Sequence, residues 1–347
     1  MKFSYVTLPD YPLKDSIEMI KTADELGFYA CYSVDETWHK DMYILFAAAA
    51  DQTKNIRFGP NLAPIGLREP TLICQALATL DELTDGRVEC VYSIGNFGLL
   101  AQYGKDWTKM HSFSRVKESH HVMRTFLDAG AITFDGDYYT YAGLVTLARP
   151  VQEHLPIIIG AMRGPKSFEL AGEVSDGVHH ALSYSKEAYE YLVEHTAAGA
   201  KKAGRDVADL DIGAWLAFTV GPDSAEAKRA AGSLVVFYVS AMPREQIERH
   251  GIDPDSLAGV LAAMGAGDIP GALDALPDGV ADQLSVAGTP EECIAKLRTI
   301  ADTGVNHMIL CVTDQILVKT FTGRDVDVPD VQGQLKMIAD DIMPAFN

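Results

Sequence analysis

One glycine-rich turn has the composition of an anion-binding site. An apolar segment, residues 155–159, runs into Gly160-Ala161-Met162-Arg163-Gly164-Pro165-Lys166, and a helical pattern begins at Lys166. The first N–H groups of a helix have no partner within it and carry the positive end of the helix dipole, so such a turn can bind phosphate. Arg163 and Lys166 add positive charge. The alternative is a connector whose glycines serve only a tight turn.

A second polar segment, Asp35-Glu36-Thr37-Trp38-His39, follows the strand-like residues 29–34. Glu36 is a candidate proton donor or acceptor, because a carboxyl group against the face of Trp38 would lose hydration and have a raised pKa. We group His39 with it as a candidate catalytic residue and assign Trp38 to the substrate. The alternative is an exposed glutamate that caps the next helix.

Two histidine pairs have different interpretations. His179 and His180 end another predicted strand, so they are candidate substrate residues, or one packs while the other caps. His120 and His121 lie in the middle of a predicted helix and indicate packing and surface positions. We predict no metal site, because the sequence contains no HExxH or similar ligand spacing.

Strand and helix patterns alternate along the chain, which predicts an α/β fold. Because no dinucleotide-binding fingerprint marks an open sheet, we expect a closed (β/α)8 TIM barrel. In such barrels the functional residues follow the carboxyl ends of the strands, where the segments above lie. The predicted strands are residues 3–7, 29–34, 56–62, 87–94, 155–159, 176–182, 210–220 and 306–312.

The length of 347 residues suits a single barrel domain, residues 1–347, with two insertions. Residues 131–149, after the fourth strand, contain Asp135-Gly136, a signature of a β-hairpin. Residues 222–285, after the seventh strand, are helical and irregular, too long for a simple crossover.

The composition limits the partners. A net charge of −19 excludes the clustered basic surface that nucleic acid or an anionic membrane requires. No signal-peptide pattern and no long apolar run is present, so we expect a cytoplasmic protein with a small-molecule substrate. The five cysteines are isolated in apolar segments and are expected to be buried free thiols.

Several motifs resemble one known superfamily. Residues 164–178, beginning Gly164-Pro165-Lys166-Ser167, resemble a segment of methylenetetrahydromethanopterin reductases, which use the deazaflavin coenzyme F420. Residues 79–87 resemble a passage found throughout luciferase-like proteins. Residues 134–139, 285–292 and 304–307 resemble coenzyme F420-dependent glucose-6-phosphate dehydrogenase. On these motifs the chain is identified as a member of the luciferase-like superfamily, in its coenzyme F420-dependent oxidoreductase group.

The resemblance implies roles for individual residues. Asp35 matches the acidic residue that contacts the deazaflavin ring, and Pro60-Asn61 falls where the family often has a non-prolyl cis peptide in a strand bulge. The predicted cofactor-binding set is Asp35, Pro60, Asn61, Ala63, Ile94, Gly95, Asn96, Gly160, Ala161, Met162, Arg163, Gly164, Pro165, Lys166 and Ser167.

The chain departs from its relatives at substrate positions. Glu36 and Asn96 replace the His and Glu of the sugar-phosphate dehydrogenases, whose phosphate-binding cations fall on Tyr184 and Gln283, so we do not expect a sugar-phosphate substrate. Val6 replaces an acidic residue of the methanopterin reductases, which counts against a folate-like or pterin substrate.

The predicted function is therefore hydride transfer between coenzyme F420 and a small organic substrate. One alternative is a luciferase-like monooxygenase that uses FMN. Another is a catalytically inactive barrel with a binding role, which the missing His and Glu would suit. The resemblance also implies a homodimer.

Overall fold

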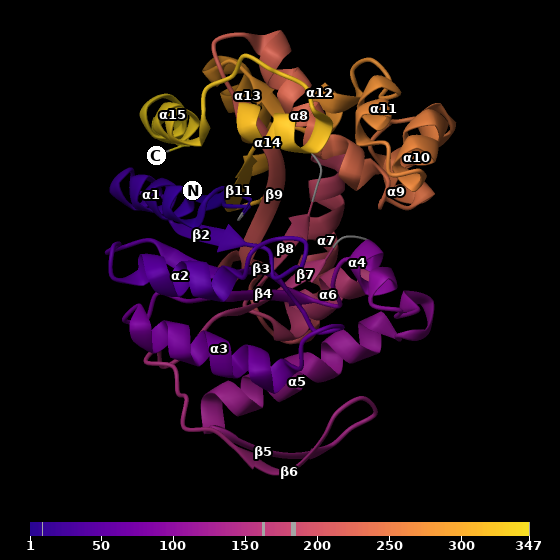
Figure 1. The fold of residues 1–347 in the computed structure, drawn as a ribbon. Coiled ribbons are helices and arrows are strands. Elements are labelled where there is room, and N and C mark those ends of the chain that lie inside the picture. The colour runs from indigo at the N-terminus through magenta and orange to yellow at the C-terminus, as the bar shows by residue number, and fades with distance from the viewer. Residues whose placement is uncertain (9, 162–163, 182–184, 347) are drawn as a thin grey trace.

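The barrel is closed by parallel strands only. In the computed structural model, which describes residues 1–8, 10–161, 164–181 and 185–346, eight strands surround the barrel axis (Figure 1). The pairing of β8 with β9 joins the two ends of the sheet and closes it. The predicted TIM barrel is confirmed. Its strands in order are β1 (Lys2–Val6), β2 (Ala30–Ser33), β3 (Arg57–Pro64), β4 (Cys90–Ser93), β7 (Ile157–Ala161), β8 (Gly177–Ala181), β9 (Asp211–Val220) and β11 (His307–Val312).

The strands are apolar because both of their faces are covered. Every residue of β11 is buried, and so is every residue of β9 after Asp211. Parallel strands enclosed by helices have this near-continuous apolar sequence rather than a strict alternation. The barrel interior and the surrounding helices consequently form one continuous core.

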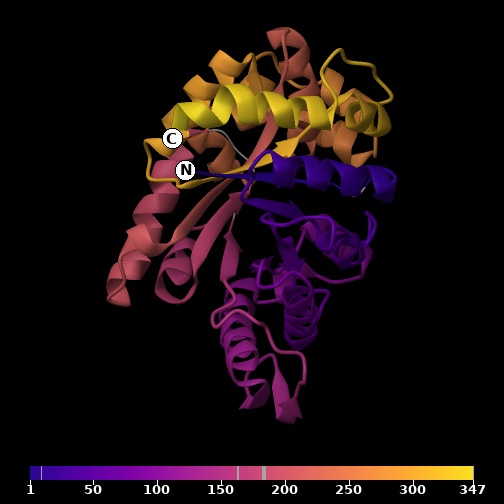
Figure 2. The ribbon, with the colours of Figure 1, turned by 90° about the vertical axis from the view of Figure 1, so that its left-hand side faces the viewer.

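The helices cover the outside of the barrel, as Figures 1 and 2 show. One start has a full side-chain cap: Thr289 and Glu292 form a capping box at the helix that begins with Pro290. The covering helices are α1 (Leu13–Glu25), α2 (Met42–Ala50), α3 (Pro70–Leu83), α5 (Ser112–Ala129), α6 (Pro165–Val174), α7 (Lys186–Lys202), α13 (Pro290–Ala301) and α15 (Val331–Met337).

The two insertions lie at opposite ends of the molecule (Figures 1 and 2). The first is the predicted hairpin, in which β5 (Ala131–Asp135) pairs antiparallel with β6 (Thr140–Val145). The second is helical, as expected. It comprises α8 (Ser224–Val239), α9 (Arg244–Arg249), α10 (Ala258–Gly265), α11 (Ile269–Asp274) and α12 (Val280–Leu284).

Three elements were not predicted. β10 (Val286–Gly288) pairs with the end of β9 beside the barrel. α4 (Phe97–Gln102) follows β4, and α14 (Gln315–Thr322) follows β11. Both helices begin at carboxyl ends of barrel strands, so they border the mouth of the barrel.

Helices α6 and α7 cross with their backbones in contact. A Cβ atom on Gly199 would lie 1.9 Å from the carbonyl oxygen of Glu169, and one on Gly172 would lie 2.1 Å from that of Thr196. Neither position has room for a side chain, because such distances are below any van der Waals contact. The crossing therefore fixes α6, whose N-terminus lies at the mouth.

The chain ends meet on one side of the barrel, where the rings of Phe3 and Phe346 pack with centroids 5.5 Å apart (Figures 1 and 2). Among the described helices, none is both long enough and apolar enough to cross a bilayer. All five cysteines are buried thiols.

Candidate active site

Asp35 lies just beyond β2 in an ion pair. Both of its carboxylate oxygens accept hydrogen bonds from Nη1 of Arg68, at 3.1 and 3.0 Å. The guanidinium of Arg68 lies 4.6 Å from the ring centroid of Tyr43, whose buried hydroxyl has no hydrogen-bond partner. Burial raises the pKa of Asp35, and the charge of Arg68 opposes that rise. The pair therefore presents a fixed, largely neutralised polar edge at the mouth.

Glu36 is a carboxyl group at the mouth whose pKa is shifted by its surroundings. Its half-buried side chain hydrogen bonds with that of Asn96, which also caps α4 through the N–H of Gly98. Burial raises the pKa of Glu36, while nearby His39 and the bond with Asn96 lower it, and the net shift is upward. A carboxyl group with a raised pKa holds its proton more tightly than an exposed glutamate does, which suits it to act as a general acid.

His39 connects this carboxyl group to another that was not predicted. Its Nδ1 lies 2.8 Å from Oδ1 of Asp10, in the loop after β1. The other carboxylate oxygen of Asp10 is buried without a hydrogen-bond partner. His39 thus pairs directly with Asp10 and acts on Glu36 through its charge, so the three side chains lie in one region of the mouth.

The loop that carries Glu36 is attached to α4. Trp38 donates a hydrogen bond from Nε1 to Oε1 of Gln102 at 2.7 Å, and the Tyr103 hydroxyl donates to Oγ1 of Thr37 at 3.2 Å. Trp38 remains 47% exposed. The role of Trp38 as a substrate residue stays a prediction.

The strand bulge is present in β3. The peptide bond between Asn61 and Leu62 is cis, one residue beyond the expected position, and the pairing of β3 with β4 shifts register between Asn61 and Ala63. A Cβ atom on Gly160 would lie 3.3 Å from the Leu62 side chain, so the bulge reaches across to β7.

Small residues allow this close packing at the mouth. Gly95, which follows β4 with a φ of 115°, would place a Cβ atom 2.9 Å from Cβ of Pro64. Pro60, Ala63 and Ile94 are buried. Ala63 lies opposite Tyr92 in the pairing of β3 with β4, while Pro60 lies opposite Ser33 of β2.

The predicted phosphate turn leads into the N-terminus of α6. Gly164 is the N-cap, no side chain caps the helix, and Pro165 is at the first position. A Cβ atom on Gly164 would meet nothing within 4 Å, while Lys166 is exposed and Ser167 is half-buried. The described part of the turn is thus open to a guest. Met162 and Arg163 lie outside the described residues.

The two predicted substrate histidines are in different environments. His179 points into the barrel, where Nδ1 lies 3.2 Å from Nδ2 of Asn61 and Nε2 lies 3.2 Å from Oδ1 of Asp211, the first residue of β9. It is below the bulge and is not exposed at the mouth. His180 packs among Phe168 and Tyr189, and its buried Nδ1 has no hydrogen-bond partner.

Further unpartnered polar groups surround the mouth. Gln246 lies on α9 and His250 just after it, and both are buried with neither side-chain polar atom hydrogen bonded. Oγ1 of Thr7 and Oδ2 of Asp314 are also buried without a hydrogen-bond partner. Thr7 directly follows β1 and Asp314 comes two residues after the end of β11, positions that could have identified them from the sequence. Buried polar atoms are almost always paired, so these groups indicate a site for a polar guest.

Known proteins share this sequence and architecture. The sequence pattern described as luciferase-like monooxygenase matches residues 1–307. The 5,10-methylenetetrahydromethanopterin reductase of Methanolobus tindarius is 33% identical over 89% of this chain and 93% of its own length. The F420-dependent glucose-6-phosphate dehydrogenase of Amycolatopsis mediterranei is 26% identical over 85% of this chain and 87% of its own.

Solved structures agree on the fold. The coenzyme F420 dependent tetrahydromethanopterin reductase from Methanopyrus kandleri superposes with a TM-score of 0.89 at 24% identity, covering 100% of this chain and 99% of the other. An F420-dependent secondary alcohol dehydrogenase gives 0.80 at 20% identity with the same coverage. The chain therefore belongs to the luciferase-like monooxygenase family, and the membership predicted from its motifs is confirmed.

Proposed function

We propose that the protein is an oxidoreductase that uses coenzyme F420 to exchange a hydride with a small organic substrate at the mouth of the barrel. The observation that carries the proposal is the open, uncapped N-terminus of α6 beside the bulge of β3. An anionic cofactor tail fits the N-terminus of α6, and a flat ring system fits against the bulge of β3. The relatives named for coenzyme F420 support this cofactor.

Each residue of the proposed site has a separate role. When bound, the cofactor supplies the site that accepts or donates the hydride. Asp35, held by Arg68, fixes the polar edge of the ring, while the exposed indole of Trp38 offers a flat apolar surface to the substrate. Glu36 donates or accepts the proton that accompanies hydride transfer. His39, bound to Asp10, restores the protonation state of Glu36.

The first substrate to test is a methylene-tetrahydropterin, because the relative at 33% identity is a reductase of that compound. Val6 argues against a pterin substrate, because the methanopterin reductases have an acidic residue at this place in strand 1. Asp10, a few residues further on, places a carboxylate with one unbonded oxygen near the same end of β1. An N–H-bearing heterocycle would satisfy that oxygen.

Ligand titration of matched variants at Gly164 tests the proposal. Gly164→Asp fits the open space and the extended backbone of an N-cap, so it should stabilise α6 by roughly 0.3 kcal/mol while repelling an anion. Affinity for coenzyme F420, followed by tryptophan fluorescence, should fall by about tenfold or more, equivalent to ~1.4 kcal/mol. Gly164→Ser, a neutral cap, is the control and should weaken binding less.

The outcomes separate the alternatives. Tighter binding of FMN than of coenzyme F420 would favour the monooxygenase, whose structural relatives include an FMN complex at a TM-score of 0.70. Failure of the wild-type protein to bind either would leave an inactive barrel. Equal affinity of the two Gly164 variants for coenzyme F420 would show that the N-terminus of α6 is not part of the cofactor site.

A further inference from the structure

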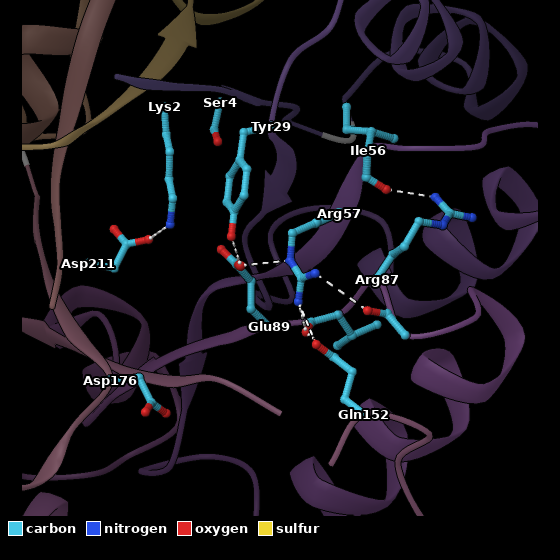
Figure 3. A network of polar contacts seen from close by, with 12 residues as sticks. Lys2, Ser4, Tyr29, Ile56, Arg57, Arg87, Glu89, Gln152, Asp176 and Asp211 are labelled. Atoms are coloured by element: carbon cyan, nitrogen blue, oxygen red, sulfur yellow. Dashed lines mark hydrogen bonds and ion pairs between the residues drawn. The ribbon is translucent and has the colours of Figure 1, made fainter. Parts of the chain in front are cut away.

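The end of the barrel opposite the mouth contains a polar cluster that the proposed function does not use. Lys2, Asp211 and His307 begin β1, β9 and β11, so they lie at the amino ends of the strands. A cavity of about 360 Å³ opens beside them and is lined in part by Lys2, Asp211 and Asn306. Figure 3 shows Lys2 bound to Asp211, with Glu89 bound separately by Tyr29 and Arg57.

Two imidazoles converge on one carboxylate oxygen. Oδ1 of Asp211 lies 2.9 Å from Nδ1 of His307 and 3.2 Å from Nε2 of His179, and all three ligand atoms lie within 4.8 Å of one another. Donors bound to one transition-metal ion at ~2.0–2.2 Å are separated from each other by roughly 3 Å. Two of the three donor pairs already have this spacing.

The outer nitrogen of each imidazole is also held. Nε2 of His307 lies 2.6 Å from Oγ of Ser4, and Nδ1 of His179 lies 3.2 Å from the side-chain amide of Asn61. The Ser4 hydroxyl can accept the N–H of His307. The Asn61 amide can accept the N–H of His179 through its Oδ1 once the amide group turns over, because Nδ2 is itself a donor. Metal-binding histidines nearly always donate their other N–H in this way, which orients the free lone pair toward the ion.

The charges around Asp211 allow a cation to bind there. Glu89 is neutralised by Arg57, whereas the partner of Asp211 is Lys2, at 2.8 Å from Oδ2. The Lys2 side chain is 41% exposed and borders the cavity, so it can turn into solvent when a divalent cation binds to Asp211. The cavity also gives an ion access to the carboxylate.

We propose that His179, Asp211 and His307 form a binding site for one divalent transition-metal ion at the base of the barrel. Two imidazole nitrogens and one carboxylate oxygen suit Zn²⁺, Co²⁺, Ni²⁺ or Fe²⁺, whereas Mg²⁺ and Ca²⁺ prefer oxygen ligands. The ion connects β8, β9 and β11 and leaves a coordination position open toward the cavity. The ligands are far apart in sequence, so the expectation of no metal site, which rested on local spacing, could not detect them.

Metal uptake by the full-length protein tests the site. After removal of metals with a chelator, the protein should bind one equivalent of Zn²⁺ with a dissociation constant of about 1 µM or below by equilibrium dialysis. Asp211→Asn and His307→Gln preserve size and hydrogen bonding and should each weaken binding by about tenfold or more. The control is His154→Gln, which changes a histidine that lines the same cavity outside the cluster and should retain binding.

Two measurements on the wild-type protein do not depend on variant folding. The Co²⁺-loaded protein should show the visible absorption of a nitrogen–oxygen site, and X-ray absorption of the Zn²⁺ form should show two imidazole ligands. Absence of stoichiometric uptake, or uptake that persists unchanged in both folded variants, would overturn the proposal and leave a hydrogen-bond network only. This result is independent of cofactor binding at the mouth.

Discussion

Mild acid should destabilise this protein through three buried histidines. Burial is the largest cause of the lowered pKa values, which are about 4 for His120, about 3 for His180 and about 4 for His250. An unfolded chain binds protons at these side chains near a pKa of about 6.5, before the folded protein does. Stability is therefore highest above that pH and falls as the pH drops from about 6.5 toward 4.

The magnitude follows from proton linkage. Between about pH 7 and pH 5, the difference between a pKa of 6.5 unfolded and 4 folded removes about 1.8 kcal/mol of stability per histidine. Summed over the three sites, two of which (His180 and His250) also repel each other when protonated, the loss is about 5 kcal/mol. A domain is typically stable by only about 5–15 kcal/mol, so this loss brings the protein close to unfolding.

Urea denaturation at several pH values, with matched variants, measures the effect. His120→Gln keeps a hydrogen-bonding partner for the Tyr92 hydroxyl, which lies 3.0 Å from Nδ1 of His120, and should reduce the pH dependence by about 1.8 kcal/mol. His121→Gln alters the exposed neighbour on the same helix and should change nothing. A wild-type free energy of unfolding that is flat between these pH values, or equal slopes for the two variants, would refute the reasoning.

Three further outcomes follow from the site and its scaffold. Glu36→Gln should lower kcat by about a hundredfold or more with cofactor affinity retained, and a change under about threefold would remove its proton-transfer role. Arg68→Met deprives Asp35 of its ion pair and should move the acidic limb of the kcat/KM profile to higher pH; an unmoved limb contradicts this. Gly199→Ala must push α6 from α7, so thermal melting should reveal a loss of about 1–3 kcal/mol, and an unchanged melting temperature would contradict the close contact.

The alternation of patterns was enough to predict the barrel. All eight predicted strands are present, because buried parallel strands produce apolar runs that turn residues separate clearly. The strand of three residues, β10, and the six-residue helix α4 were missed. Such short elements contain too few residues to show a period, and tertiary contacts decide them.

The site was only partly predictable for a similar reason. Glu36, Asp35 and Gly164 follow strands, and the closed barrel brings those strand ends together. The partnership of His39 with Asp10 and the burial of His179 against Asp211 depend on pairs that are 29 and 32 residues apart. One sequence carries no signal for such contacts, because loop and side-chain geometry determine them.

The crossing of α6 over α7 has a consequence for how the protein can evolve. Because main chain touches main chain at Gly172 and Gly199, side chains on the outer faces of both helices contribute little to where the N-terminus of α6 points. Mutational drift, or a library built by random mutagenesis, can therefore replace most of that outer surface without displacing this N-terminus. The two glycines should be the positions in these helices where selection tolerates least change.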